Sequence, residues 1–366
     1  MRKLVKNGSI TFAQTIMIMM LGTGLMNHVI VIPVLMEVAK RDAWVSVILA
    51  GVINIAWVAL LYTALSKTRH IHVFEWLGKA YSPVLAKMLA GVACLYMLLL
   101  CAITLRDTST WIHLTFLPKV PIFVLALCFG VLCLFNAYAG IRSIASMSGL
   151  LLPFVVVFGF FVMTANIPNK RYALLQPILE SGMKPVWSGT IYVAAGLIEI
   201  VLLLFLQQHI RSTYSLWHVL VLAFILTGLT IGPVMGGIAE FGPEKLAMLR
   251  YPAFEEWRLV TIGRYIEHVD FLSIYQWFSG AFIRISLSMF LFADMLSIRK
   301  PRSKKTVFTL VLLVSVLFTV YAIGDDQFLD ILRDYVLPAV VAVITVYTLM
   351  LIALIHAKRR RGESHG

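Results

Sequence analysis

Long apolar blocks separated by short polar segments dominate this sequence. A run of about 20 apolar residues is long enough to cross the hydrocarbon core of a bilayer as a helix. The blocks have these approximate bounds: 10–37, 42–66, 83–105, 120–138, 143–167, 186–208, 215–237, 272–297, 306–323 and 334–356. The pattern predicts a single all-α membrane domain over 1–366 with ten transmembrane helices. Residues 10–167 and 186–356 would form two halves of five helices each.

Composition and charge agree with this reading and add an orientation. The chain is 60% hydrophobic and only 13% charged, whereas a soluble domain carries about 25% charge. Ten spans place both ends on one side of the membrane. The segments on that side hold 18 Lys and Arg against two acids, and those on the other side hold 12 against 14. Basic loops favour the cytoplasmic side. We therefore expect both termini in the cytoplasm, with the basic runs contacting the lipid bilayer and no nucleic acid.

Small residues interrupt the first and sixth spans near their middle. Gly22, Thr23 and Gly24 lie about 12 residues into the first block, and Ala195 and Gly196 lie about nine residues into the sixth. Glycine weakens a helix interior by roughly 1 kcal/mol relative to alanine. Corresponding helices of two oppositely oriented halves, both broken at mid-depth, are typical of transporter binding sites. The alternative is that the small residues serve close helix packing.

A broken helix at mid-depth would offer a ligand site. It exposes N–H groups that attract anions and carbonyls that attract cations, so one break can bind both ends of an amino acid. We predict that the five small residues contact such a ligand. Tyr96 and Met97, halfway along the third span, are candidates for a wall of the same site, although aromatic residues at this spacing also serve packing.

Two charges stand at depths where charge is costly. Glu199 follows Gly196 by three residues, and Arg284 lies 12 residues into the eighth span. A central charge costs at least about 2.5–3.5 kcal/mol on insertion scales, so we predict that the two pair with each other beside the substrate. A purely structural salt bridge is the first alternative. In a second alternative, Arg284 contacts backbone carbonyls freed by the first break. In a third, it contacts a carboxylate of the substrate.

Two hydroxyls follow Arg284 on the same span. Ser286 and Ser288 would suit a sodium site, but the adjacent guanidinium opposes a cation. We therefore interpret Arg284 as a fixed substitute for a coupling ion, keep both serines as substrate-binding candidates, and expect no metal and no cofactor.

The longest polar connection is predicted over 238–271. After Pro252 its charged and apolar residues alternate at helical spacing. This predicts an interfacial helix over 253–268 with Trp257 at the level of the headgroups. A gate, a docking surface and a solvated connector are alternative interpretations.

This connection and the eighth span carry a family resemblance. Tyr251-Pro252, Arg258, the stretch from Glu267 to Asp270, Trp277, and Arg284 to Ser286 resemble the pattern of B-type subunits of the nutrient germinant receptors of bacterial endospores. His268 departs from it, since arginine is common there. The resemblance implies the amino acid–polyamine–organocation transporter superfamily and its LeuT-like inverted-repeat fold with broken helices 1 and 6. It implies a germinant-sensing subunit in the spore inner membrane, with an A-type membrane subunit and a C-type lipoprotein as partners. It further implies amino acids as germinants, with sugars or nucleosides recognised elsewhere in the complex.

Three functions compete at this point. The first is a receptor subunit that binds a small nutrient and passes a conformational signal to its partners. The second is a working amino-acid permease, which has the same fold. The third is a ligand-free scaffold or a channel subunit. An enzyme is not expected, because the sequence has no nucleophile motif, no paired histidines at zinc spacing and no phosphate loop.

Overall fold

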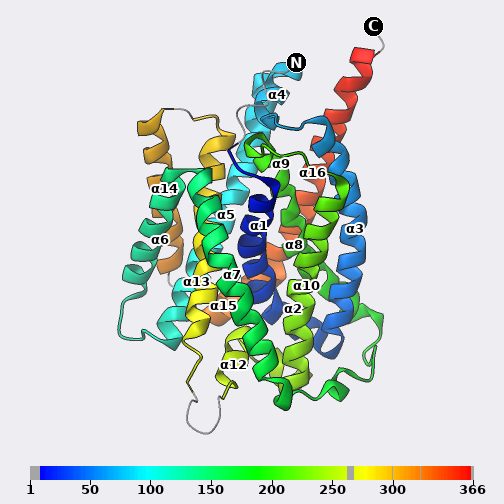
Figure 1. The fold of residues 1–366 in the computed structure, drawn as a ribbon, viewed down its shortest axis with the longest axis vertical. Helices are drawn as coiled ribbons and strands as arrows, with labels where there is room; N and C mark the ends of the chain where they lie inside the picture. Colours follow the sequence, from blue (N-terminus) through cyan, green and yellow to red (C-terminus); the bar gives the residue numbers. More distant parts are fainter. Residues whose placement is uncertain (1–8, 262–267, 299, 322, 364–366) are drawn as a thin grey trace.

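The structure is a computed structural model, and it describes residues 9–261, 268–298, 300–321 and 323–363, the last six by their backbone alone. Every named element in this part of the chain is a helix, and the one isolated β-bridge joins Ile10 to Ile210. The predicted all-α class is confirmed (Figure 1).

The long helices follow the predicted apolar blocks closely. They are α1 (Phe12–Leu25) with α2 (Val31–Ala39), α3 (Ala43–Lys67), α5 (Pro83–Thr115), α6 (Ile122–Ala139), α7 (Ile141–Ala165), α8 (Met183–Leu197) with α9 (Leu202–Leu206), α10 (Leu216–Phe241), α13 (Leu272–Met295), α14 (Pro301–Val320) and α16 (Leu337–Glu363). The short helices are α4 (Val73–Ala80), α11 (Pro243–Ala247), α12 (Pro252–Arg258) and α15 (Asp325–Ile331).

Within the described residues, nine helical stretches are long and apolar enough to cross a membrane. The first of them, Phe12–Lys67, is one run of 56 residues. It reverses direction at the 3₁₀ turn η3 (Lys40–Asp42), where Lys40 has a φ of 44°, so α1–α2 and α3 run antiparallel (Figure 1). The count of ten crossings stays a prediction.

The perimeter of the bundle is apolar, as a surface facing lipid requires. Large hydrophobic side chains are more than half exposed on several helices, among them Val52 of α3, Leu95 of α5, Phe135 of α6, Val157 of α7 and Phe224 of α10. A soluble protein rarely leaves so much contiguous apolar surface in water. The chain is therefore a multi-pass membrane protein.

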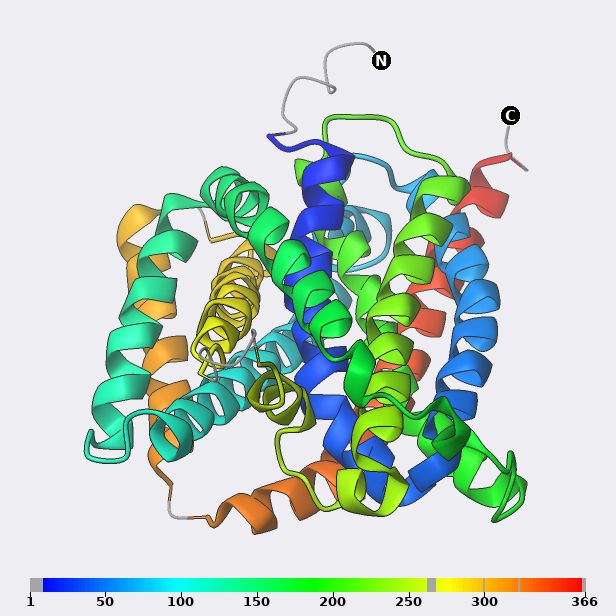
Figure 2. The ribbon, with the colours of Figure 1, turned by 60° about the horizontal axis from the view of Figure 1, so that its bottom comes forward.

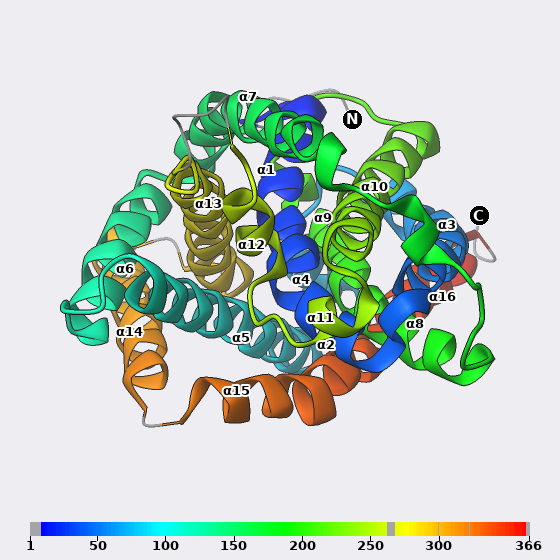
Figure 3. The same ribbon diagram turned by 90° about the horizontal axis from the view of Figure 1, so that it is seen from below.

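Helix α1 lies inside the bundle and packs against α7, α10 and α13. It begins at the same end of the bundle at which α16 ends, which we name the terminal end (Figure 1). Helices α11 and α12 lie at the opposite end, which we name the distal end. Figures 2 and 3 show α12 across the distal end of the bundle, near α10 and α13.

The first helix deviates from α-helical geometry one turn later than predicted. Gly22 and Gly24 lie within α1, and the deviation is the π-helical segment η2 (Met26–Ile30). Its cause is Pro33, which has no N–H and whose ring clashes with the carbonyl four residues earlier in a regular helix. The predicted break at Gly22 to Gly24 is therefore wrong. At Gly22 the first helix packs against α13, because an ideal Cβ there would lie 3.7 Å from the Arg284 Cα, an ordinary contact distance.

The sixth span likewise stays α-helical through Ala195 and Gly196. It tightens only afterwards, in the 3₁₀ segment η6 (Ile198–Val201) that contains Glu199. An ideal Cβ on Gly196 would lie 1.6 Å from the Asn27 Oδ1 atom of η2. This glycine therefore allows the irregular parts of the two helices to meet, and the predicted break at Ala195–Gly196 is also displaced by one turn.

Candidate functional site

Glu199 and Arg284 form a bidentate ion pair inside the bundle. Arg284 Nη1 donates to Glu199 Oε2 at 2.6 Å and Nη2 donates to Oε1 at 2.5 Å. The Arg284 side chain is 4% exposed and that of Glu199 is 0% exposed. Arg284 also donates through Nε to Thr104 Oγ1 at 2.9 Å and through Nη1 to the Gly22 carbonyl at 3.0 Å. The predicted pair is confirmed.

The contact with Gly22 follows from the irregular end of α1. The Met26 amide would bond the Gly22 carbonyl in a regular α-helix, but it donates to Thr23 instead. This leaves the Gly22 carbonyl available to Arg284. The guanidinium thus joins α1, α5, η6 and α13, and both the direct pair and the contact with the first helix, proposed as alternatives, exist together.

The other predicted candidates are also buried inside the bundle. Tyr96 and Met97 lie in the interior on α5, and the Tyr96 hydroxyl has no hydrogen-bond partner within the described part of the chain. Ser286 donates to the Cys133 carbonyl of α6 at 3.1 Å, and Ser288 is buried in α13.

A separate cavity of about 460 Å³ lies between these candidates and the distal end. Helices α1, α7, α10, α12 and α13 and the segment η2 line it. Most of its lining is apolar, and its polar lining residues are His28, Lys170, Glu256, Ser273 and Gln276. A mostly apolar cavity of 300–1,000 Å³ with a few polar groups is the usual form of a small-molecule site. Among the predicted site residues, only Gly24 lines it, so a substrate role for the others stays a prediction.

Helix α10 contributes a wall without side chains. Gly228, Gly232 and Gly236 recur every fourth residue, which puts them on one face of the helix, and all three line the cavity. An ideal Cβ on Gly228 or Gly232 would meet no atom within 4 Å. The glycines therefore border open space and do not serve a helix contact there.

A proline in the same helix supplies a hydrogen-bond acceptor to the cavity wall. Pro233 has no N–H, so the Leu229 carbonyl lacks its helical donor. His28 Nδ1 lies 3.3 Å from that carbonyl and donates to it when it carries the proton. The irregular first helix is thus tied to α10 at the cavity, and His28 is satisfied by the backbone.

Helix α12 covers the cavity at the distal end and differs from the predicted interfacial helix. It spans Pro252–Arg258, and residues 262–267 of the predicted helix lie outside the described residues. Trp257 is 3% exposed, and its Nε1 donates to Gln276 Oε1 of α13 at 2.8 Å. The Trp257 side chain therefore faces the interior of the protein, and its depth in the membrane stays a prediction. The partner of the Trp257 indole, Gln276, lies on another helix, so no local sequence pattern predicts this contact.

An ion network holds the segment before α12 in place. Arg250 donates to Asp107 of α5 at 2.7 Å and to Asp325 of α15 at 2.9 Å. Asp107 is buried, so its charge depends on Arg250 for compensation. Tyr251 adds a 3.3 Å contact between its hydroxyl and Asp325. The cover of the cavity is thereby fixed to helices on the far side of the bundle.

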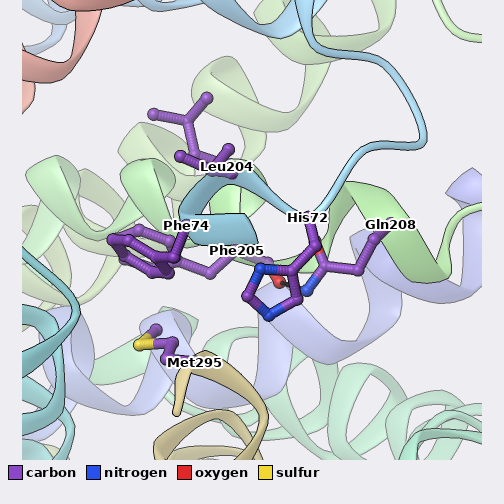
Figure 4. A pocket seen from close by; sticks show the side chains of 7 residues that line it. His72, Phe74, Leu204, Phe205, Gln208 and Met295 are labelled. Carbon is purple, nitrogen blue, oxygen red and sulfur yellow. Dashed lines mark hydrogen bonds between the residues drawn. The ribbon is translucent and has the colours of Figure 1, made fainter. Parts of the chain in front are cut away.

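The terminal end is closed beneath the cavity. Phe74, the second residue of α4, stacks on Phe205 of α9 with ring centroids 5.7 Å apart (Figure 4). Asp294 of α13 accepts from Gln208 Nε2 at 2.8 Å and lies 2.9 Å from His209 Nε2. The pocket that Phe74 and Phe205 share with His72 and Gln208 has no room for a water molecule.

Comparison with known proteins decides the family. A family model described as spore germination protein matches residues 9–328. The chain belongs to the spore germination protein family. It is 39% identical to spore germination protein XB of Bacillus anthracis over 352 residues, which cover 96% of this chain and 99% of that protein. The family expected from the sequence is confirmed.

Solved structures give the fold of this family member. The nucleobase-cation-symport-1 family transporter Mhp1, in a closed conformation with bromovinylhydantoin bound, matches 93% of this chain and 79% of its own, with a TM-score of 0.66 and 13% identity. A Na⁺-coupled sialic acid symporter in a substrate-bound outward-open state matches 93% and 78%, with a TM-score of 0.55 and 12% identity. The predicted LeuT-like transporter fold is confirmed.

Several cavity residues escaped the sequence analysis. Lys170 and Glu256 lie in polar connections between the predicted spans, and Gln276 is a single polar residue in the apolar eighth span, so no local pattern marks them as site residues. The glycines of α10 offered a readable signal, because glycine at every fourth position beside Pro233 marks a helix face without side chains.

Proposed function

We propose that this spore germination protein is the nutrient-sensing subunit of a germinant receptor. In this proposal a small nutrient, an amino acid, binds in the 460 Å³ cavity. The observation that carries the proposal is that cavity itself, which is largely apolar, has a few polar groups, and is lined by the first helix and four others of a transporter fold.

The proposed signal is a shift between two arrangements of the bundle. A ligand shifts such an equilibrium only by its differential affinity for the two states. Contacts from α1 and α12 to the ligand would supply that difference, since these elements belong to different parts of the bundle. The recipients would be an A-type membrane subunit and a C-type lipoprotein. We place the chain in the spore inner membrane with the basic terminal end toward the spore core.

A working permease is the second candidate, because both solved structures cited above are transporters by name. The closed terminal end fits both candidates, because the transporter Mhp1 was itself solved in a closed conformation. A permease must separate Phe74 from Phe205 and Asp294 from His209 in every cycle, whereas a sensor needs no passage there.

Binding without transport is the expected result. Purified protein should bind a radiolabelled amino acid in detergent, while proteoliposomes containing it should accumulate no more label than empty liposomes. Asp294→Asn serves as the control that the assay detects passage, since it weakens the closure at the terminal end. Saturable uptake by the unmodified protein would establish the permease instead, and an absence of binding to any nutrient would contradict both functions.

A further inference from the structure

A buried cluster with one more acid than base lies at the distal end of the cavity. Glu240 stands at the end of α10, Glu256 in α12, and Lys170 in the connection between α7 and α8. Lys170 Nζ lies 3.4 Å from Glu240 Oε1, and the two side chains are 4% and 0% exposed. Lys170 Nζ also donates to the Met163 carbonyl at 3.0 Å. The Lys170 ammonium group therefore already pairs with Glu240 and donates a hydrogen bond to the backbone.

Among the residues that the structure describes, Glu256 is the acid of this cluster that forms no ion pair. It is 8% exposed and lines the cavity, and its Oε1 atom has no hydrogen-bond partner in the same part of the chain. Gly236 leaves it room, because an ideal Cβ there would lie 3.8 Å from Glu256 Oε1 and 3.7 Å from Lys170 Nζ. A buried carboxylate without a counter-charge is costly and is compensated by a proton or by a cation.

The rest of the cavity limits what that cation can be. Leu21, Leu25, Val155 and Leu229 are among the aliphatic side chains that line it. A small hydrated ion gains nothing from such walls, whereas an organic cation with an apolar tail buries that tail against them. The cavity is thus complementary to an apolar body with one positive end.

We propose that Glu256 binds the ammonium group of the ligand, with Glu240 adding to the negative potential. This inference rests on the proposed function in taking the cavity as the ligand site, and it names the ligand class as primary amines with an apolar tail, α-amino acids included. Lys170 keeps Glu240 paired, so that Glu256 is the carboxylate left for the ligand.

A proton competes with the ammonium group for the same carboxylate. Burial and the neighbouring Glu240 carboxylate raise the pKa of Glu256 well above its ordinary value, and Lys170 opposes them. Below that raised pKa, Glu256 is protonated and the ammonium must displace the proton. The affinity for amines should therefore rise with pH through that pKa and level off above it. His28 also lines the cavity, and a proton on it would repel an amine in the same sense.

Two probes that each keep one charged group of leucine test the subsite. Isopentylamine has the leucine skeleton without the carboxylate, and 4-methylpentanoate has it without the amine. We expect millimolar isopentylamine to raise the melting temperature of the full chain in detergent and to bind more tightly at higher pH. We expect no stabilisation by 4-methylpentanoate.

Variants then assign the effect to the cluster. Glu256→Gln should weaken isopentylamine binding about ten- to a hundredfold, the effect of losing a charged hydrogen bond, and should remove the part of its pH dependence that comes from Glu256, leaving only that of His28. Glu240→Gln frees Lys170 to pair with Glu256 and should weaken binding as well. Glu244→Gln is the matched control, because Glu244 lies on neighbouring α11, is 68% exposed and pairs with Lys40. It should bind isopentylamine like the unmodified protein.

The outcomes separate this subsite from the proposed function. A nutrient that binds equally well to Glu256→Gln and Glu240→Gln would overturn the subsite and leave the sensor proposal intact. Isopentylamine binding that depends on Glu256, in a protein that binds no nutrient, would support the subsite and overturn the sensor. Failure of isopentylamine to bind, or equal stabilisation by 4-methylpentanoate, would overturn the subsite.

Discussion

Replacing either member of the central ion pair is expected to lower the free energy of unfolding by about 3–5 kcal/mol, the usual loss when one partner of a buried pair is removed. Glu199→Gln leaves the Arg284 guanidinium, and Arg284→Gln leaves a carboxylate that is 0% exposed. Arg284→Gln should cost more, because its guanidinium also donates to Thr104 and to the Gly22 carbonyl. Chemical unfolding of the purified protein in detergent measures both losses.

The double variant and one control isolate the pair. Glu199→Gln combined with Arg284→Gln should be less harmful than the sum of the two, because neither charge is then stranded. Thr104→Val removes one neutral acceptor from the guanidinium and should cost only about 1 kcal/mol. Losses that add to within about 0.5 kcal/mol would show that the two charges do not stabilise each other.

Gly232→Leu is expected to abolish ligand binding without a loss of stability. Gly232 lines the cavity, and an ideal Cβ there meets no atom within 4 Å, so the leucine side chain extends into the space that the ligand would occupy. Replacing glycine within a helix also favours the helix by up to about 1 kcal/mol. Equilibrium binding and thermal unfolding of the same preparation measure the two effects separately.

Gly91→Leu is the matched control for this substitution. Gly91 lies within α5, likewise has no atom within 4 Å of an ideal Cβ, and does not line the cavity. This variant should bind ligand normally. Gly24→Leu approaches the cavity from the α1 side, where the Cβ would lie 3.3 Å from Leu229 Cδ1, so it should block binding at a small cost in stability. Normal binding by Gly232→Leu would show that the ligand occupies another place.

The helices and the central pair were readable in the sequence for physical reasons. Bilayer thickness sets the length of an apolar run, so α6 (Ile122–Ala139) appears where the block 120–138 predicted it. The cost of an isolated charge at mid-depth forces compensation, and Glu199 and Arg284 were the candidates near the middle of their spans. Both arguments depend on the solvent, which acts alike on every chain.

The local geometry of the first helix was predicted less well. Glycine permits an irregularity but does not require one, and Gly22 and Gly24 stay helical. Pro33 removes a donor and adds a clash, and the π-helical segment lies directly before it. The position of Pro33 therefore predicts where the deviation lies better than the positions of the glycines do.

The cavity and its cover could not be predicted from single segments. Space remains where side chains of several helices do not meet, which depends on how α1, α7, α10 and α13 pack together. The burial of Trp257 likewise depends on Gln276, nineteen residues away on another helix. Such contacts become visible only in the folded chain.

The central claim is that a nutrient binds in the cavity beneath α12, and the most direct measurement is an experimental structure of the protein with a nutrient that raises its melting temperature. We predict that the ligand lies between Gly24 and Gly232 with its amine against Glu256. A ligand found instead at the junction of η2 and η6, beside Asn27 and Glu199, would contradict the account, and so would a protein that no nutrient stabilises.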